Sequence, residues 1–365
     1  MIQVKWQPLK GEWSIGLSER FETLLLAGVA KLLRRRDPYL NYSVAHAVEY
    51  YGEDCLRWVK HHLMQSLDLP VPYELIHDYR TDAVPSRWGT VAFSGTYELP
   101  PVLLEHRQRM VARMLREKRI SDRNSPCPRV ADLDNRDGSL TFSLQKSRYY
   151  DQVGTNLTLD YPIPDGLPHG GGSARTVREW DLRQCGITVP RPPSFQASRL
   201  ANTIGVAVAL SATDERGQVH YLKRWRTPRA PVYPATWHLP VSFALRWEDS
   251  IESRAGYDIS DVIKFDLPDE VRAEASVSHD DFGPLIPLAF CRDLPRGGKP
   301  QFFCEMHSRL PYEQLIGRVK DQGREYKRQP RAETGYANLA VLRPSAELAC
   351  YVALKLTQPG SVARA

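Results

Sequence analysis

Two glutamates in a short acidic segment are the residues of this sequence best suited to do chemistry. Glu270 and Glu274 are four positions apart, within a stretch that has helical spacing. On a helix, residues four apart project from one face with their Cβ atoms about 5–6 Å apart. Two carboxylates placed in this way can share Mg²⁺ or Mn²⁺, because a hard cation takes one or two carboxylates together with substrate phosphates. Most pairs of this kind are solvated surface charges, and that interpretation stands beside the metal-binding one.

A proline-rich loop with basic and aromatic side chains comes before this segment. Arg224, Arg226 and Arg229 are spaced around it, and guanidinium groups donate forked hydrogen bonds to phosphate oxygens. Tyr233 and Trp237 lie in the same loop. We therefore expect the loop to bind phosphate groups and to supply the aromatic wall of a base or sugar site.

A second pair of aromatic residues follows a strand-like segment earlier in the chain. Tyr149 and Tyr150 come at the end of a stretch in which apolar and hydroxyl residues alternate. Their rings can stack on a base or a sugar. Ordinary turn chemistry by the nearby Asp, Gly and Asn residues explains the segment equally well, so both interpretations remain.

The order of hairpin, loop and acidic segment resembles the Nudix hydrolase family. The family's box reads G-x5-E-x7-R-E-U-x-E-E-x-G-U, where U is a bulky aliphatic residue. With its second half laid on the acidic segment, Glu270 and Glu274 match two glutamates, and Val271 and Val277 match the aliphatic positions. The resemblance implies that both glutamates are metal ligands and catalytic residues, and that a later acidic residue, Glu305, completes the metal site.

The sequence departs from the family's box at several positions. Asp269 replaces an arginine, Ala273 a glutamate and Ser276 a glycine, while Ala255 and Asp261 fall at the first glycine and glutamate. The change at Ala273 removes either a water-mediated metal ligand or the base. It affects turnover more than metal binding.

The resemblance covers roughly residues 200–345 and implies an α+β fold, a Nudix-like α/β/α sandwich with a mixed sheet. The apolar run over 201–211 and the segment 219–225, joined by a turn at 214–217, predict a central β-hairpin. Further strands are expected over 286–291 and 301–307.

A chain of 365 residues favours two domains, since single cores seldom grow beyond about 250–300 residues. Apolar spacing predicts helices over 17–36, 43–66 and 103–120. The polar, proline-bearing segment 121–138 reads as a loop. We therefore predict a mostly helical N-terminal domain over 1–135 and a Nudix-like domain over 136–365.

The predicted helix over 103–120 has a strongly basic face. Six basic residues stand against two glutamates, and such a face is either solvated or suited to docking an acidic protein partner. The basic residues are Arg107, Arg109, Arg113, Arg116, Lys118 and Arg119.

Composition and charge limit the class of partner and the compartment. The net charge of +6 permits contact with nucleotides, but no recognised nucleic-acid-binding motif is present, so we do not expect nucleic acid as a partner. No apolar run approaches the ~20 residues needed to span a bilayer, and the first residues lack a signal-peptide pattern. The expected location is cytoplasmic, without membrane attachment.

Two hypotheses for function follow. One is a metal-assisted, Nudix-like hydrolase of a nucleoside diphosphate linked to another moiety. The other is a catalytically inactive Nudix-fold module that binds a nucleotide-type ligand or a protein partner. Asp269 and Ala273 favour the second, as do Ser242 and Phe243, which stand where the family commonly has paired glycines. Retention of both main ligand positions favours the first.

Overall fold

The computed structural model describes ten segments of the chain, and all statements below concern them. They are residues 3–7, 12–16, 73–81, 87–136, 139–169, 172–187, 192–253, 256–322, 331–334 and 345–356. The helices predicted over 17–36 and 43–66 lie outside the described residues.

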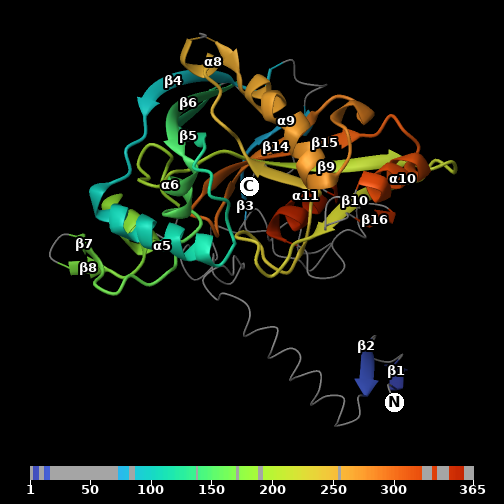
Figure 1. Cartoon of the computed structure of the whole chain (residues 1–365), viewed down its shortest axis with the longest axis horizontal. Coiled ribbons are helices and arrows are strands. Elements are labelled where there is room, and N and C mark those ends of the chain that lie inside the picture. The colour runs from blue at the N-terminus through green and yellow to red at the C-terminus, as the bar shows by residue number, and fades with distance from the viewer. Residues whose placement is uncertain are drawn as a thin grey trace.

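A mixed eight-stranded sheet lies at the centre of the molecule (Figure 1). Its strand order is β11-β10-β9-β15-β14-β3, while β12 also pairs with β9 and β16 with β10. β9 and β15 are parallel and the other pairs are antiparallel, which confirms the expected mixed sheet and the β9–β10 hairpin. The strands are β3 (Tyr73–Asp78), β9 (Gly205–Thr213), β10 (Val219–Trp225), β11 (Trp237–His238), β12 (Val241–Ala244), β14 (Ile286–Asp293), β15 (Lys299–His307) and β16 (Arg331–Thr334).

The central strand β9 is buried on both faces, as its continuous apolar sequence predicts. Because side chains alternate along a strand, Val206 and Val208 pack into one hydrophobic cluster and Ala207 and Ala209 into another. Helices α9 (Ile259–Ala275) and α10 (Tyr312–Gln322) cover the first face. Helix α11 (Ala346–Leu356) covers the opposite face.

A second, four-stranded sheet packs beside α9 on the first face of the main sheet. Its order is β13-β4-β6-β5, with β4 and β6 parallel. Phe142 of β6 joins the two sheets, since its ring centroid lies 5.1 Å from that of Phe290 and 5.9 Å from that of Phe302. The strands are β4 (Thr90–Thr96), β5 (Pro126–Arg136), β6 (Ser139–Arg148) and β13 (Tyr257–Asp258).

The predicted loop over 121–138 is wrong for most of its length, because residues 126–136 form β5. The strand runs along the edge of its sheet, where proline is tolerated and costs no ladder hydrogen bond. β5 and β6 pair along their lengths up to Arg136 and Ser139, across the predicted boundary. The described part of the first 135 residues contains strands and a single α-helix, which does not support a mostly helical N-terminal domain. The division into two domains stays a prediction.

Shorter elements complete the described structure. The helix predicted over 103–120 is confirmed for α5 (Leu104–Arg116), which a 3-10 turn (Pro101–Leu103) precedes. In the part of the chain that the structure describes, no helix is long and apolar enough to cross a membrane. The remaining elements are β1 (Gln3–Gln7), β2 (Glu12–Gly16), α6 (Tyr149–Val153), β7 (Leu167–His169), β8 (Gly172–Ala174), α7 (Val177–Gln184), α8 (Ser250–Ser253) and 3-10 turns at Tyr79–Thr81 and His279–Asp281.

Candidate functional site

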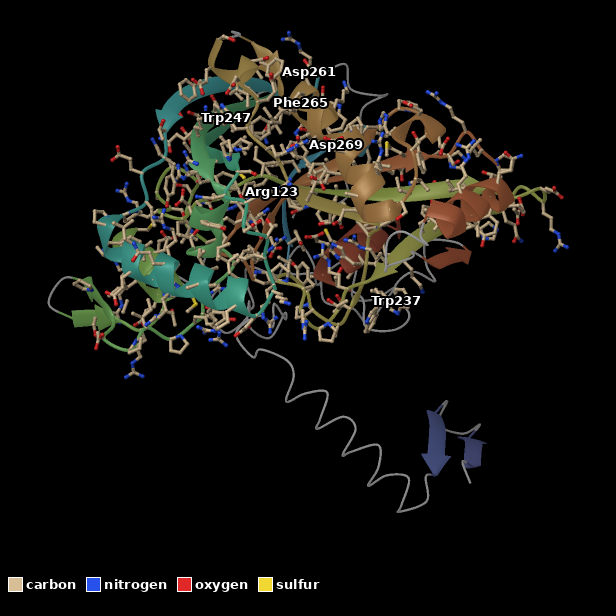
Figure 2. All side chains as sticks on the ribbon, viewed as in Figure 1. Arg123, Trp237, Trp247, Asp261, Phe265 and Asp269 are labelled. Atoms are coloured by element: carbon tan, nitrogen blue, oxygen red, sulfur yellow. The ribbon has the colours of Figure 1, made fainter. Side chains whose placement is uncertain are left out.

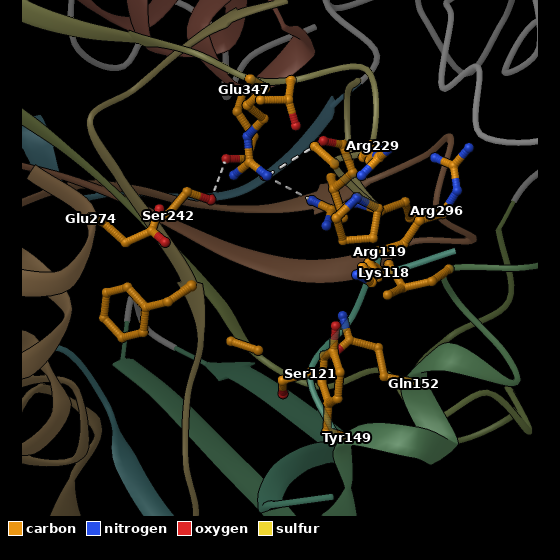
Figure 3. A pocket seen from close by; sticks show the side chains of 18 of the residues that line it. Lys118, Arg119, Ser121, Tyr149, Gln152, Arg229, Ser242, Glu274, Arg296 and Glu347 are labelled. Atoms are coloured by element: carbon orange, nitrogen blue, oxygen red, sulfur yellow. Dashed lines mark hydrogen bonds and ion pairs between the residues drawn. The ribbon is translucent and has the colours of Figure 1, made fainter. Parts of the chain in front are cut away.

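A cavity of about 1580 Å³ lies where α5, α6, α9, α11 and the main sheet meet. Figure 3 shows Arg119, Arg229 and Arg296 on one side of it and Ser242 and Glu274 on the other. The lining comes from segments on both sides of the predicted domain boundary, because α5 and the turn after it contribute to the same cavity as α9.

The cavity is strongly basic. Among the described residues, nine basic and four acidic side chains line it. The end of α5 and the turn after it supply four of the basic groups, and the end of β10 with its following loop supplies three. The last two come from the β14–β15 turn and the start of β15. Such an excess of positive charge in a concave site attracts polyanions. The nine are Arg113, Arg116, Lys118, Arg119, Arg224, Arg226, Arg229, Arg296 and Lys299.

Helix α9 brings the two predicted glutamates to the cavity wall. Asp258 caps its start by accepting a hydrogen bond from the Ser260 amide at 2.8 Å. Buried apolar residues at three- and four-residue steps, including Ile259 and Val271, hold one face of the helix on the core. Glu270 and Glu274 lie off this face and line the cavity, as the sequence predicts.

The residue that ends α9 has a backbone conformation typical of glycine. Ser276 follows the helix in the left-handed conformation, with φ of 58°. Glycine adopts this conformation without steric cost. The position at which the family has a glycine therefore still makes a glycine-like turn, although its side chain differs.

The exposed side of α9 faces away from the cavity. Figure 2 shows Asp261, Phe265 and Asp269 along this helix. The Asp269 side chain is 70% exposed and lies 3.2 Å from the Arg246 guanidinium. The residue that replaces the family's arginine is therefore a surface charge here.

The two glutamates have different electrostatic surroundings. Glu274 forms an ion pair with the Arg224 guanidinium. Burial, and next the charge of Glu274, raise the pKa of the Glu270 carboxyl to about 7. Glu270 is thus a carboxylate that gains or loses a proton near neutral pH, as a general base requires.

A buried ionic network forms one end of the cavity. Arg296 donates to Asp293 at 2.6 Å and to Glu347 at 3.0 Å, and all three side chains are almost fully buried. His238 Nε2 lies 2.9 Å from Glu347, and its Nδ1 lies 2.6 Å from the Ser345 hydroxyl. Burial, followed by the nearby Arg226, lowers the pKa of His238 to about 3, so the imidazole is neutral at physiological pH.

Three buried polar groups on the lining lack a hydrogen-bond partner within the described structure. They are Arg226 Nε, Thr227 Oγ1 and Gln152 Oε1. Burial, and next the charge of Arg224, lower the pKa of Arg226 to about 10. Because buried polar atoms are nearly always hydrogen-bonded, these groups are suited to contact a ligand or ordered water.

Six of the predicted site residues line the cavity. They are Tyr149, Arg224, Arg226, Arg229, Glu270 and Glu274.

Three predicted aromatic residues do not belong to the described lining of the cavity. Tyr233 is buried, and its hydroxyl donates to Asp293 at 2.6 Å. Trp237 packs edge-to-face on Trp225, with ring centroids 5.3 Å apart. Tyr150 lies on α6, and its ring contacts that of Tyr149. Tyr150, Tyr233 and Trp237 therefore lie outside the described lining of this cavity, and their predicted binding roles stay predictions.

Glu305, the predicted third metal ligand, contacts α11 in the structure. It forms an ion pair with Lys355 of α11 at 3.0 Å and accepts a hydrogen bond from Tyr351 at 3.2 Å. Side chains alternate along β15, so Glu305 projects to the α11 side of the sheet. Glu270 and Glu274 belong to α9 on the other side, so the structure does not bring Glu305 together with them.

The donor set limits how a metal ion can be held. In the part of the chain that the structure describes, no three His, Cys, Asp or Glu side chains lie together as a metal site requires. Glu270 and Glu274 alone fit a cation that takes two carboxylates together with ligand phosphate oxygens. They do not fit a cation held by protein groups alone, because Arg224 already pairs with Glu274.

Sequence reasoning missed the lining groups at the buried end of the cavity: Gln152, Arg296, Lys299, Gln301 and Glu347. They belong to separate elements and form no motif. The basic face of α5 was noticed, but as a docking surface for a partner. Four of its residues, or residues just after it, line the cavity instead, while docking of a protein partner stays a prediction.

Comparisons with known proteins find similarity only to solved structures, and only over part of this chain. No protein-family model matches it, and no curated protein does. Among solved structures, 41% of the chain is similar to 82% of a Nudix hydrolase from M. smegmatis, with 14% identity and a TM-score of 0.28. A protein from Deinococcus radiodurans is similar over 41% of this chain and 80% of its own length, with 18% identity and a TM-score of 0.25.

Proposed function

We propose that this protein binds a nucleotide-type ligand through its phosphate groups in the basic cavity. The observation that carries the proposal is the lining of nine basic against four acidic side chains. Arg226 adds to it, since its Nε is buried on the lining without a partner in the described structure. Charge-assisted hydrogen bonds from guanidinium groups to phosphate are among the strongest that proteins make.

The binding test compares ADP with adenosine by isothermal titration, in EDTA so that no turnover occurs. We expect ADP to bind, adenosine to bind far more weakly, and ADP affinity to fall as salt is raised. Arg226→Met should weaken ADP binding about tenfold or more, because a hydrogen bond to a charged group is lost. Arg183→Met is the matched control, since Arg183 is exposed on α7 and remote from the lining. Equal affinity for adenosine and ADP would exclude phosphate recognition.

A second candidate function is metal-assisted hydrolysis of a nucleoside diphosphate linked to another moiety. The raised pKa of Glu270, beside Glu274 on the cavity wall, favours it. In this reaction, water forms a bond to phosphorus, the bridging P–O bond breaks, and the attacking water gives its proton to a carboxylate such as Glu270. Mg²⁺ or Mn²⁺, held at this pair by direct contact with Glu274 and the ligand, would neutralise phosphate charge and activate water, which leaves Glu270 to accept the proton.

Hydrolysis is tested with a panel of UDP-glucose, NAD and ADP-ribose in the presence of Mg²⁺ or Mn²⁺, with products separated by chromatography. If turnover occurs, Glu270→Gln should lower it by about 10²-fold, the usual contribution of a general base. Asp269→Asn, on the exposed side of the same helix, should leave it unchanged. Tight ligand binding with no turnover under any condition would favour the inactive module.

A further inference from the structure

We propose that Lys299 anchors the terminal phosphate group of the ligand at the closed end of the cavity, and so selects ligands that end in an unsubstituted phosphate. The inference rests on the proposed phosphate-binding function and narrows the ligand class.

The cavity changes from exposed to closed along its length. Arg116, Lys118 and Arg229 are exposed on its lining. Lys299 and Gln301 also line it, yet each is only 1% exposed. Because Lys299 and Gln301 are almost fully buried, we infer that a phosphate beside them is enclosed by protein on its far side, whereas the exposed end holds the rest of the nucleotide.

Lys299 forms no ion pair within the described structure, although the charges of Glu347 and Asp293 act on it. Its only hydrogen bond there is to the Pro300 carbonyl oxygen at 3.5 Å, at the weak limit for such a bond. Arg296 differs, because Asp293 and Glu347 already compensate its charge. A buried ammonium group without a partner is unfavourable, and a phosphate oxygen would supply the missing negative charge.

The backbone of β9 leaves space for this lysine. A Cβ atom on Gly205 would lie 2.5 Å from Lys299 Nζ and 2.2 Å from Gln301 Oε1. Glycine inside a strand marks a place where another group approaches the backbone closely. Gly205 therefore allows the lysine and the amide to stand together at the closed end.

Phosphate binding at Lys299 should take up protons. Burial, and next the charge of Arg296, lower the pKa of Lys299 to about 7, while Glu347, Asp293 and the Cys127 thiol act in the opposite direction. A phosphate beside the amine favours its charged form and raises the pKa again. With a pKa near 7 the free amine is only partly protonated at neutral pH, so binding takes up part of a proton. Affinity should fall as the pH rises above 7.

The test is calorimetric titration of the full chain with ADP and with ADP-ribose, whose phosphates are both esterified, in EDTA at pH 7 and in two buffers of different ionisation enthalpy. We expect Lys299→Met to lose ADP affinity by about tenfold or more, to keep ADP-ribose affinity, and to lose the proton uptake. Glu270→Gln serves as a control, because its carboxyl also titrates near pH 7. The uptake that depends on Lys299 should persist in that variant.

Several results would overturn the inference. If Lys299→Met binds ADP like the wild type, or weakens both ligands equally, Lys299 does not select a terminal phosphate, although the proposed function stands. If neither ligand binds the wild type, the inference and the proposed function both fail. If Lys299→Met does not fold, Gly205→Ala carries the test, because it keeps the charge and fills the space around Nζ. Unchanged ADP affinity in this folded variant would contradict the inference.

Discussion

Arg296→Met should lower the free energy of unfolding by about 3–5 kcal/mol, the usual cost of removing one partner of a buried ion pair. Arg296 donates to Asp293 and to Glu347, whose side chains are 0% and 1% exposed. Without the guanidinium group, both carboxylates stay buried without their main positive charge. Urea denaturation followed by circular dichroism measures the effect.

The matched control for this substitution is Arg229→Met. Arg229 lines the same cavity but is exposed. Its removal should change the free energy of unfolding by no more than about 0.5 kcal/mol, as for most surface substitutions. Equal effects of the two substitutions would mean that the network around Arg296 does not support the fold.

Arg178→Met should also lower the free energy of unfolding, by roughly 3–5 kcal/mol, because it too removes one partner of a buried ion pair. The Arg178 side chain is 2% exposed and pairs with both carboxylate oxygens of Asp160, at 2.7 and 2.9 Å. It also donates to the carbonyl oxygens of Leu294 and Pro295, in the turn that carries Arg296. The substitution should therefore weaken ADP binding as well as stability.

Arg183→Met on the same helix is the control for that result. Arg183 pairs with Glu179 one turn away, with 40% of its side chain exposed. Exposed pairs at this spacing contribute at most about 0.5 kcal/mol. A loss below 1 kcal/mol for Arg178→Met, measured in the same way, would show that the buried pair with Asp160 matters no more than a surface pair.

Local sequence patterns were sufficient to predict the helix and the strands that carry much of the cavity lining. A continuous apolar run and turn residues predicted the β9–β10 hairpin, and helical spacing placed Glu270 and Glu274 together on α9. These features depend on residues close in sequence, so the chain's own periodicity reports them. The segment that forms β5 was misjudged, because its prolines and charges have the composition of a loop. Only its position at a sheet edge makes a strand compatible with them.

The sequence by itself determined which side chains were available for chemistry: two carboxylates one helical turn apart, and many arginines near them. Tertiary structure decided which of them meet. Glu305 was predicted on a strand and is on one, yet the two-residue period of β15 directs it to the α11 side of the sheet. Lys299 on β15 and Glu347 on α11 are far apart along the chain, yet both line one cavity. Burial then lowers the pKa of Lys299 and raises that of Glu270, because the charged form of each loses its hydration. No local pattern carries that information, since it depends on which segments exclude water together.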